Sequence, residues 1–309
     1  MNRGTAVCQG LTQRIAYMCP LCSEKTLEVY IEDDDQTITS SALGSSRTEL
    51  SPGRILRCYN CRFGFRQLRP SDEQLAQLYQ RLDAQVYESE TEGRFRAAAG
   101  YLRIVERHVS APGRILDIGC ASGFFLRCAK DASWDIAGIE PSEVLYTKAR
   151  EVLGATAEIQ CTTLQLSYLP YLSFDVVTLW DVLEHVPNPV DFLRLAGSFL
   201  KPGGYLFANV PNLDSIQARL LGRKWPLLLP EHLNYFNSDS LQMCGKKAGL
   251  RWVQSCRRSA AFSLGYVLYR LQQHRIAGTS LAHRPVSSLS ISDLIIPVPL
   301  GEICGVWKH

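Results

Sequence analysis

The stretch Gly113–Leu126, GRILDIGCASGFFL, decides the architecture of this chain. It opens with an apolar run, carries one acid at Asp117, and then places Gly119 and Gly123 with only small residues between them. A buried strand that stops at glycine and restarts as a helix presents backbone N–H groups and the positive end of the helix dipole to whatever lies above it. The stretch therefore predicts a strand, a turn and a helix that bind a ligand; the simpler alternative is a tight turn that binds none.

The spacing of the glycines narrows the class of ligand. No Gly-Lys-Ser/Thr follows Gly123, which argues against a P-loop. Cys120, Ala121 and Ser122 separate the two glycines, whereas the dinucleotide fingerprint begins G-x-G. A carboxylate at Asp117 would repel a pyrophosphate but attract an ammonium or sulfonium group. We therefore expect a ligand with positive charge near the loop and a ribose farther along, which fits S-adenosylmethionine better than NAD.

Length and composition indicate an ordinary globular protein. A chain of 309 residues exceeds the usual size of one domain, so we expect a large domain with a smaller appendage. Hydrophobic residues make up 46% and charged residues 20%. The net charge of +3 is too mild to argue for nucleic-acid binding by itself. The sequence shows no long apolar run and no secretory signal, so we expect no membrane segment and a cytoplasmic location.

Two C-x-x-C pairs near the N-terminus predict a metal site. They are CPLC, with Cys19 and Cys22, and CYNC, with Cys58 and Cys61. Two such knuckles can supply four thiolates in a tetrahedron, as in a zinc ribbon. A redox C-x-x-C would normally begin a helix in a βαβ unit, which neither pair does. We therefore expect residues 1–70 to form a zinc-ribbon domain with a structural zinc ion.

The rest of the chain divides into two parts. Residues 71–110 carry two helical patterns and are expected to form a helical linker or cap. Residues 111–309 alternate strand and helix patterns, which predicts a parallel sheet with helices on both faces. Strands are expected at 114–118, 134–140, 156–161, 173–180, 205–211, 251–257 and 301–309. The insertion at 212–236 holds Trp225 and the run PLLLP, too apolar for a solvated loop, and is expected to fold over the ligand site as a lid.

Several motifs in order then point to one family. LDIGCASG, GIEPS, FDVVTLWDVLEHVPNP, LKPGG and PEHLNYF together resemble the class I S-adenosylmethionine-dependent methyltransferases of the small-molecule type, over roughly residues 76–309. The resemblance implies an α/β fold with a Rossmann-like sheet of seven strands. Together with the ribbon, the chain is also similar to methyltransferases of sugar and glycan biosynthesis. It implies methyl transfer to a small biosynthetic intermediate, with a nucleotide-linked sugar or glycan precursor as the expected acceptor.

The resemblance also assigns residues to the methionine and ribose ends of the cofactor. Asp117 and the backbone of Gly119 should hold the methionine end, while Cys120 and Gly123 shape the loop. Glu140, at the tip of the second strand, should accept hydrogen bonds from both ribose hydroxyls, because two adjacent acceptors match two vicinal donors.

The expected adenine contacts depart from the family pattern. The family often has an acid after the third strand that faces the adenine amine, whereas this chain has CTTLQLS there. Thr163 and Leu164 are therefore expected to contact adenine through backbone and apolar surface.

Several roles are open for the W-D-V-L-E-H segment after the fourth strand. Asp181 can line the methionine pocket, and His185 can deprotonate the acceptor. Alternatively, Asp181, Glu184 and His185 can bind a divalent ion, as in some related quinone methyltransferases. The simplest alternative is that Glu184 and His185 only brace the loop. His232, in the insertion, competes with His185 as the catalytic base.

Residues near the opening of the sheet are expected to contact the acceptor. They are Tyr87 and Arg94 from the leading helices, and Trp225 and Tyr235 from the insertion. The partner is therefore expected to be a small molecule, with no membrane and no nucleic acid; the oligomeric state is not predicted.

Two other functions compete with this interpretation. Zinc ribbons also precede RNA methyltransferase domains, but the acidic run EDDD at 32–35 breaks any basic stripe on the ribbon. The second alternative is a protein that binds S-adenosylmethionine without catalysis. For such a protein we would expect a cofactor-binding loop that has lost some of its motif residues. Asp117, Gly119, Gly123 and Glu140 are all present.

Overall fold

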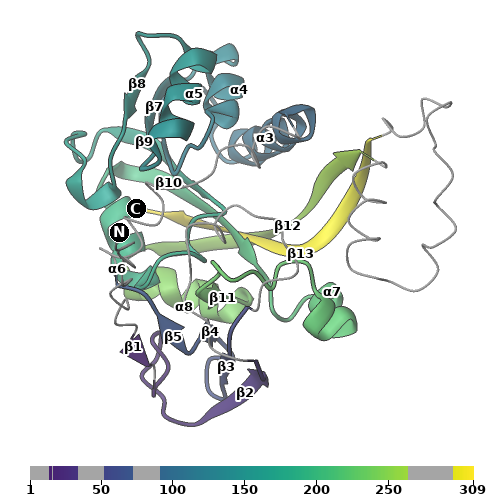
Figure 1. Cartoon of the computed structure of the whole chain (residues 1–309). Coiled ribbons are helices and arrows are strands. Elements are labelled where there is room, and N and C mark those ends of the chain that lie inside the picture. Colours follow the sequence, from purple (N-terminus) through teal and green to yellow (C-terminus); the bar gives the residue numbers. More distant parts are fainter. Residues whose placement is uncertain (1–13, 16, 34–51, 72–90, 264–294) are drawn as a thin grey trace, which may run out of the picture.

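A seven-stranded sheet forms the centre of the molecule (Figure 1). The computed structural model describes residues 14–15, 17–33, 52–71, 91–263 and 295–309. The strand order is β12-β13-β10-β9-β6-β7-β8. The bounds are β6 (Arg114–Ile118), β7 (Asp135–Ile139), β8 (Glu158–Gln160), β9 (Phe174–Trp180), β10 (Leu200–Pro211), β12 (Arg251–Ser263) and β13 (Ile295–Lys308).

Most of the sheet is parallel. Strands β8, β7, β6, β9 and β10 run in the same direction, and β13 pairs antiparallel with both β10 and β12. This arrangement confirms the expected fold class. Strand β13 starts at Ile295 rather than at the expected residue 301, because its ladder with β12 continues to the pair Ser263 and Ile295.

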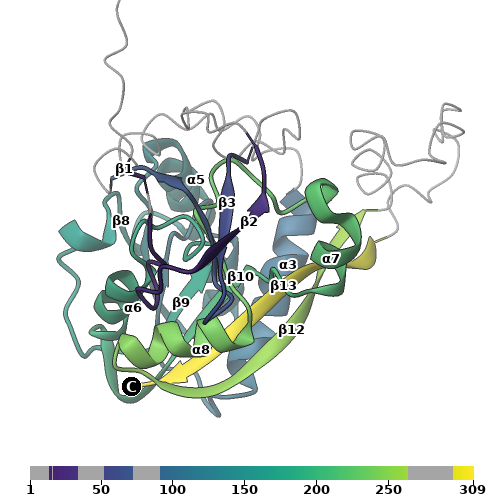
Figure 2. The same cartoon turned by 90° about the horizontal axis from the view of Figure 1, so that it is seen from below.

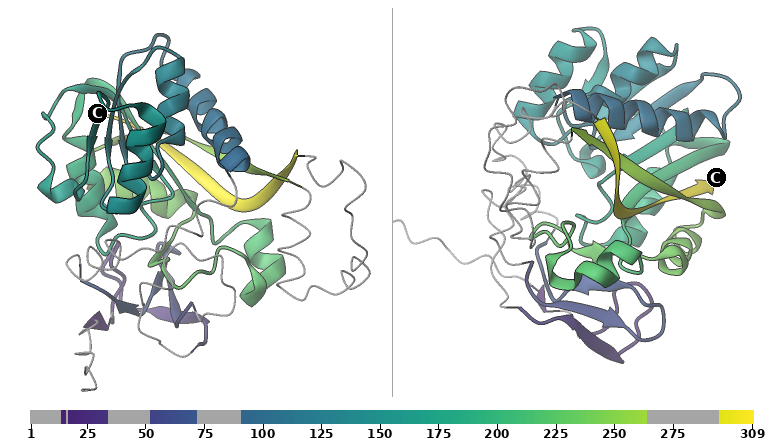
Figure 3. Two further views of the ribbon diagram at one scale, coloured as in Figure 1. Left: turned by 45° about the horizontal axis from the view of Figure 1, so that its top comes forward. Right: turned by 90° about the vertical axis from the view of Figure 1, so that its right-hand side faces the viewer.

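Helices cover both faces of the sheet, as Figure 3 shows from two further sides. Alternate residues of a strand point to opposite faces, so Ile115 packs in one core and Leu116 in the other. The first core contains side chains of α3 (Thr91–Glu106), α4 (Phe124–Asp131) and α5 (Glu143–Leu153). The second contains those of α6 (Pro189–Gly197) and α8 (Ser238–Lys247).

One helix is shorter than its sequence pattern indicates, and another helical pattern lies outside the described residues. The sequence NPVDFLRLAGSFLKPGG, residues 188–204, reads as a single helix, but the helix ends at Gly197. Pro202 lacks the N–H that a longer helix would need, and Gly203 adopts a positive φ of 82°, so the chain enters β10 instead. The helical pattern at 71–87 lies outside the described residues. Within the described part of the chain, no helix combines the length and apolarity needed to cross a bilayer.

The ribbon is built from short antiparallel strands, which lie below the central sheet in Figure 1 and in front of it when the molecule is seen from below (Figure 2). Strands β2 (Leu27–Ile31), β3 (Ile55–Cys58) and β4 (Gly64–Arg66) pair in that order. A fourth strand, β11 (Asn234–Tyr235), comes from the insertion and pairs antiparallel with β4. A separate pair joins β1 (Arg14–Ile15) to β5 (Leu68–Arg69). The sheet of the ribbon is therefore completed by a segment far along the chain.

The insertion at 212–236 packs against the ribbon. It contains α7 (Ile216–Leu221), the 3-10 turn η3 (Gly222–Lys224) and β11. Its Leu213 and Trp225 share a small apolar core with Ile31 and Ile55 of the ribbon. The side chain of Leu213 packs so closely on the backbone of Gly64 that a Cβ at Gly64 would lie 2.6 Å from Cδ2 of Leu213.

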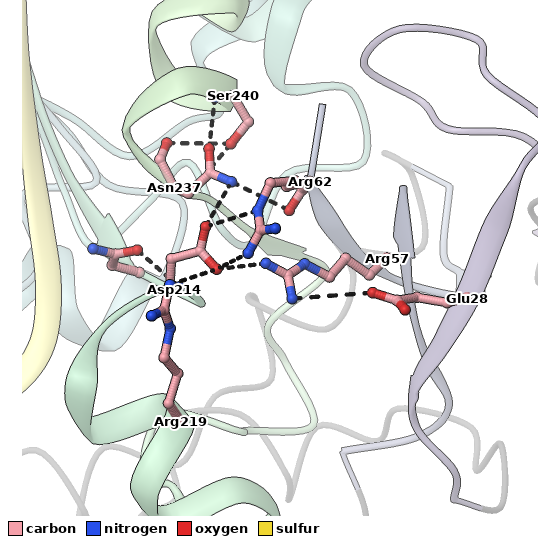
Figure 4. A network of polar contacts seen from close by, with 8 residues as sticks. Glu28, Arg57, Arg62, Asp214, Arg219, Asn237 and Ser240 are labelled. Carbon is pink, nitrogen blue, oxygen red and sulfur yellow. Dashed lines mark hydrogen bonds and ion pairs between the residues drawn. The ribbon is translucent and has the colours of Figure 1, made fainter. Parts of the chain in front are cut away.

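Charged side chains also join the insertion to the ribbon at Asp214 (Figure 4). Arg57 and Arg62 of the ribbon both donate to its carboxylate. Asn237 donates to the same group at 3.2 Å and to the carbonyl oxygen of Arg62 at 3.4 Å. Burial by itself would raise the pKa of Asp214, but the arginines lower it below its ordinary value. Asp214 therefore stays charged and holds the two parts together.

The contact between α8 and β13 gives a direct test of this packing. A Cβ on Gly245 of α8 would lie 1.8 Å from Nε1 of the buried Trp307. Because the indole is fully enclosed, Gly245→Ala should destabilise the protein by about 1–3 kcal/mol through overpacking, seen as a lower melting temperature.

Gly100→Ala is the matched control for that substitution. Gly100 lies inside α3, and a Cβ placed on it would come no closer than 3.8 Å to its nearest neighbour, Nη2 of Arg103. Alanine there should raise stability by about 0.5–1 kcal/mol. Equal melting temperatures for the two variants would contradict the packing described for α8.

Candidate active site

The carboxyl ends of the parallel strands bring three acids to one edge of the sheet. Asp117 lies in β6 and is paired with Gly138 of β7 and Thr178 of β9. Glu140 directly follows β7, and Asp181 directly follows β9. Open α/β sheets bind ligands at this edge.

The glycine turn after β6 is held by backbone hydrogen bonds. The N–H groups of Gly119 and Cys120 both donate to the carbonyl oxygen of Ile139, at 2.7 and 3.0 Å. Gly119 has a φ of 74°, and a Cβ on it would lie 2.7 Å from Cγ2 of Val182. Gly123, with a φ of 77°, precedes the first residue of α4. The turn requires glycine at both places, and a ligand contact of Gly119 has to use its carbonyl group.

Asp117 is a buried acid with one hydrogen-bond partner in the described structure. Its Oδ1 accepts from the hydroxyl of Thr178 at 2.7 Å. Burial raises the pKa of Asp117 to about 8, and the charges of Glu140 and Asp181 act in the same direction. A cation bound beside the carboxyl would favour its charged form. The site is therefore suited to a ligand that carries an ammonium group.

Glu140 has both carboxylate oxygens fixed by the backbone. Oε2 accepts from the N–H of Ala121 at 2.9 Å, and Oε1 accepts from the N–H of Ser142 at 2.8 Å. Burial raises the pKa of Glu140 to about 7, against the lowering effect of these two bonds. A carboxylate has about four acceptor sites, so each oxygen can accept a second donor. The geometry suits two neighbouring hydroxyl groups.

A polar residue that the sequence analysis missed lies beside Glu140. Gln160 ends β8, and its carbonyl oxygen accepts from the N–H of Glu140 at 3.0 Å. Its side-chain oxygen accepts from Ser167, whereas its buried Nε2 has no hydrogen-bond partner among the described residues. The sequence feature that could have identified Gln160 is a polar residue at the end of a buried strand. The expected Thr163 and Leu164 follow nearby, half-buried and buried.

Asp181 is fixed at a strained position. Its φ is 58°, in the left-handed region that non-glycine residues rarely adopt. Its Oδ2 accepts from the hydroxyl of Tyr101 at 3.0 Å, and its Oδ1 accepts from Nδ2 of Asn209 at 2.6 Å. The ring of Tyr101 stacks on Trp180. Tyr101 and Asn209, neither of which the sequence analysis singled out, therefore orient Asp181, which is exposed at the edge of the sheet.

Glu184, His185 and His232 form a second cluster. A ligand atom from each lies within 4.8 Å of the other two, although His232 comes from the insertion. Oε2 of the buried Glu184 has no hydrogen-bond partner in the described structure. Burial raises the pKa of Glu184 well above its ordinary value, and the charge of Asp181 adds to this. The described residues thus group His232, in place of Asp181, with Glu184 and His185 as potential ligands of a divalent ion.

Hydrogen bonds determine the tautomer of both imidazoles. Nδ1 of His185 lies 3.1 Å from the carbonyl oxygen of Glu231, and Nδ1 of His232 lies 2.9 Å from that of Leu227. Because a carbonyl can only accept, each Nδ1 carries the hydrogen and each Nε2 carries the lone pair. Burial lowers the pKa of His185 to about 4 and that of His232 well below its ordinary value. Both rings are therefore neutral near pH 7.

The residues expected to contact an acceptor are distributed unevenly. Tyr235 is buried next to His232, with ring centroids 6.1 Å apart, and its hydroxyl has no partner among the described residues. Trp225 lies in the core of the insertion and donates from its indole to the carbonyl oxygen of Leu300. Arg94 is half-buried on α3, and Tyr87 lies outside the described residues.

The cysteines of the ribbon form a compact group. The sulfur atoms of Cys19, Cys22, Cys58 and Cys61 lie within 4.8 Å of one another, with 3.6 Å between Cys19 and Cys61 and 3.5 Å between Cys22 and Cys58. Sulfurs about 2.3 Å from a tetrahedral zinc ion are about 3.8 Å apart. The hydrogen bond from the neighbouring Cys61 thiol lowers the pKa of Cys19 and so favours a thiolate at that position. The group fits a closed zinc site.

Sequence comparisons identify similar proteins. Residues 90–255, more than half of the chain, match the family model described as "Methyltransferase domain". The Ubiquinone biosynthesis O-methyltransferase of Coxiella burnetii is 25% identical over 161 residues, which cover 48% of this chain and 69% of that protein. The protein of the same name from Stutzerimonas stutzeri is 30% identical over 140 residues, covering 43% and 60%.

Solved structures show the same fold at low sequence identity. The [4+2]-cyclase SpnF has a TM-score of 0.52 and 19% identity, covering 78% of this chain and 97% of the cyclase. A chain from the complex between the Haloferax volcanii Trm112 methyltransferase activator and the putative methyltransferase has a TM-score of 0.50 and 15% identity, covering 70% and 90%. At these identities the likeness concerns the fold alone.

Proposed function

Because this chain belongs to the methyltransferase family, we propose that it transfers the methyl group of S-adenosylmethionine to a hydroxyl oxygen of a small biosynthetic intermediate. The observation that carries this proposal is the cluster of Glu184, His185 and His232 at the edge of the sheet where Asp181 follows β9. The similar proteins named O-methyltransferase support oxygen as the acceptor atom.

The edge of the sheet offers a partner for each part of the cofactor. Asp117 pairs with the ammonium group, and Glu140 accepts from the ribose hydroxyls. Asp181 lines the methionine pocket, held by its own two hydrogen bonds. The loop with Gly119, Cys120 and Gly123 gives the backbone its close approach, and the adenine end is formed by Thr163, Leu164 and Gln160.

The chemistry asks the protein mainly for alignment and one base. When bound, S-adenosylmethionine supplies a methyl group already activated on a sulfonium, so holding the acceptor in line contributes most of the acceleration. Nε2 of His185 or His232 accepts the proton of the acceptor hydroxyl. Their low pKa values make both imidazoles weak bases, which suits an acidic hydroxyl such as a phenol.

A nucleotide-linked sugar or glycan precursor is the second candidate acceptor. The cluster offers several hydrogen-bonding groups close together, including Glu184 and the hydroxyl of Tyr235, neither of which has all its polar atoms paired among the described residues. A polyhydroxyl acceptor would use more of these groups than a phenol would.

The bracing role proposed for the loop after β9 can be performed by other atoms. The carbonyl oxygen of Glu184 accepts from the N–H groups of Leu233 and Asn234, at 2.8 and 3.0 Å. Nδ2 of Asn234 donates to the carbonyl oxygens of Leu183 and Val186. Bracing of the loop therefore does not depend on the carboxyl of Glu184 or on Nε2 of His185, which we assign to chemistry as a base or, alternatively, as ligands of a divalent ion.

The structure adds little support for the two other functions, RNA methylation and cofactor binding without catalysis. Arg57 and Arg62 of the ribbon are paired with Asp214, which leaves less positive charge on the ribbon for RNA phosphates. A cyclase shares this fold, so the fold alone does not determine the reaction. RNA methylation and binding without catalysis are therefore outcomes of the turnover experiment below.

The four cysteines of the ribbon are proposed to hold one structural zinc. Protein purified without added zinc should contain about one zinc per chain by elemental analysis, and strong chelation should unfold the ribbon. Cys128→Ser, which changes a buried cysteine of α4, should leave the zinc content unchanged. Protein without metal, or a disulfide within either C-x-x-C pair, would contradict the assignment.

Glu140 is the residue whose loss should weaken cofactor binding most plainly. Removing hydrogen bonds to a charged group costs roughly 1.5–3 kcal/mol. Glu140→Ala should therefore raise the dissociation constant of S-adenosylmethionine at least about tenfold by calorimetry. Glu143→Ala, at the first residue of α5, serves as the control and should bind normally. Unchanged affinity in Glu140→Ala would remove this residue from the site.

Turnover tests the function and the base together. The protein should form S-adenosylhomocysteine from S-adenosylmethionine with catechol, a small phenol, or with a nucleotide sugar. His185→Ala or His232→Ala should lower the turnover of the accepted substrate about 10²–10⁴-fold, with cofactor affinity nearly unchanged, if that histidine is the base. His309→Ala, far from the cluster in the sequence and exposed, is the control.

The pH dependence of turnover distinguishes a buried base of low pKa from a histidine of ordinary pKa. A base with a pKa of about 4 is already deprotonated well below pH 6, so turnover at saturating cofactor should lack an acid limb near pH 6.5.

Turnover with RNA only, or with no acceptor from either class, would overturn the proposed acceptor. Full activity in both histidine variants would leave the imidazoles as scaffolding.

A further inference from the structure

One side chain from the ribbon joins the two segments that carry the histidines. Nη1 of Arg69 donates to the carbonyl oxygen of Leu233 at 2.9 Å, next to His232. Its Nη2 donates to the carbonyl oxygen of Pro187 at 2.7 Å, two residues after His185. The same guanidinium therefore bonds to both segments.

Asn234 completes this connection. Its Oδ1 accepts from Nη2 of Arg69 at 2.8 Å, while its Nδ2 donates to the loop after β9, to Val186 at 2.7 Å. The amide is thus held between the ribbon and the loop. Because both of its ends are used, a shift of Arg69 would move Asn234 relative to Val186.

The environment of Arg69 makes its geometry hard to replace. The residue is only 8% exposed. Burial lowers the pKa of Arg69 to about 10, so it remains protonated near pH 7. Its three partners are neutral oxygens that lie in fixed directions, and the planar fork of a guanidinium matches them, whereas a lysine ammonium is a single point charge.

We propose that Arg69 is a positioning residue that fixes the imidazole of His232 relative to that of His185. The two ring centroids are 4.8 Å apart, and Arg69 bonds to the segment of each. The ribbon is then a working part of the acceptor site, and the metal that folds the ribbon supports this site indirectly. The catalytic consequence rests on the proposed function; the positional one does not.

Arg66 provides a matched control in the same ribbon. It is 1% exposed, and its Nη1 donates to the carbonyl oxygen of Pro230 at 2.6 Å. It therefore supports the His232 segment through a buried guanidinium, as Arg69 does, but this bond joins the ribbon to the insertion alone and does not involve the loop after β9. Arg66→Met should match the loss of a buried arginine without breaking the connection between the segments.

The first measurement needs no substrate. The N–H groups of Leu233 and Asn234 donate to Glu184, so their hydrogen exchange reports the contact between the segments. Arg69→Met should speed the exchange of these two amides at least about tenfold. Arg66→Met should change it much less, and the amide of Gly119, bonded to Ile139, should exchange at the same rate in all variants.

The second measurement is turnover with catechol and S-adenosylmethionine. Arg69→Met should lower kcat about 10–100-fold, as for other groups that orient a reacting residue, with the dissociation constant of S-adenosylmethionine within about twofold of wild type. Arg69→Lys, which retains the charge, should recover part of the kcat and part of the slow exchange. If Arg69→Met does not fold, Arg69→Lys is used for both measurements in its place.

Each outcome bears on the proposal. Unchanged exchange at Leu233 and Asn234 in both Arg69 variants would overturn it, whatever the turnover. An equal loss of kcat in Arg66→Met and Arg69→Met would also overturn it, because the effect would then be a general loss of packing. If wild type does not methylate catechol, the proposed function fails with this acceptor, and the exchange measurement alone decides the role of Arg69.

Discussion

The pairing of β11 with β4 is the contact on which the acceptor side of this molecule depends. It consists of two residue pairs, Asn234 with Phe65 and Tyr235 with Gly64. A ladder this short is weak by itself, and the buried edge-to-face contact of Phe63 with Phe236 reinforces it. The charged group around Asp214 adds a second connection. Together with the apolar core that Leu213 and Trp225 share with the ribbon, these contacts hold the insertion that carries His232.

The proposed cofactor residues and the proposed acceptor residues come from different parts of the structure. The central sheet supplies Asp117, Glu140 and Asp181 from the ends of adjacent strands, so the cofactor side follows from the fold. We place the acceptor between the loop after β9 and the insertion, and the ribbon contacts this insertion through β4 and through the charged group at Asp214. A cyclase shares this fold, so the sheet alone does not determine the reaction.

The parts that could be predicted from sequence are those in which the evidence is local. RILDI forms β6 at the expected residues, and the glycine turn follows it, because an apolar run and two glycines suffice to specify them. The four cysteines also lie together, as their knuckle spacing indicates. Glu140 lies at the tip of its strand for the same reason.

The parts that could not be predicted depend on contacts between distant segments. No local pattern indicates that Arg69 bonds next to both histidines or that His232 lies against His185. Trp225 was expected at the acceptor, but an aromatic residue in an apolar insertion serves equally well as its core, where the structure places it. Gln160 was missed because a single polar residue at a strand end is a weak signal.

The most direct test of this account is a crystal structure with S-adenosylhomocysteine bound. The account predicts the ribose on Glu140, the ammonium group on Asp117, and the thioether sulfur facing the imidazoles of His185 and His232. Nε2 of at least one of them should lie within about 10 Å of the sulfur, close enough for direct or single-water contact with an acceptor placed between them. A sulfur farther than this from both imidazoles, or a ligand bound away from Glu140, would contradict it.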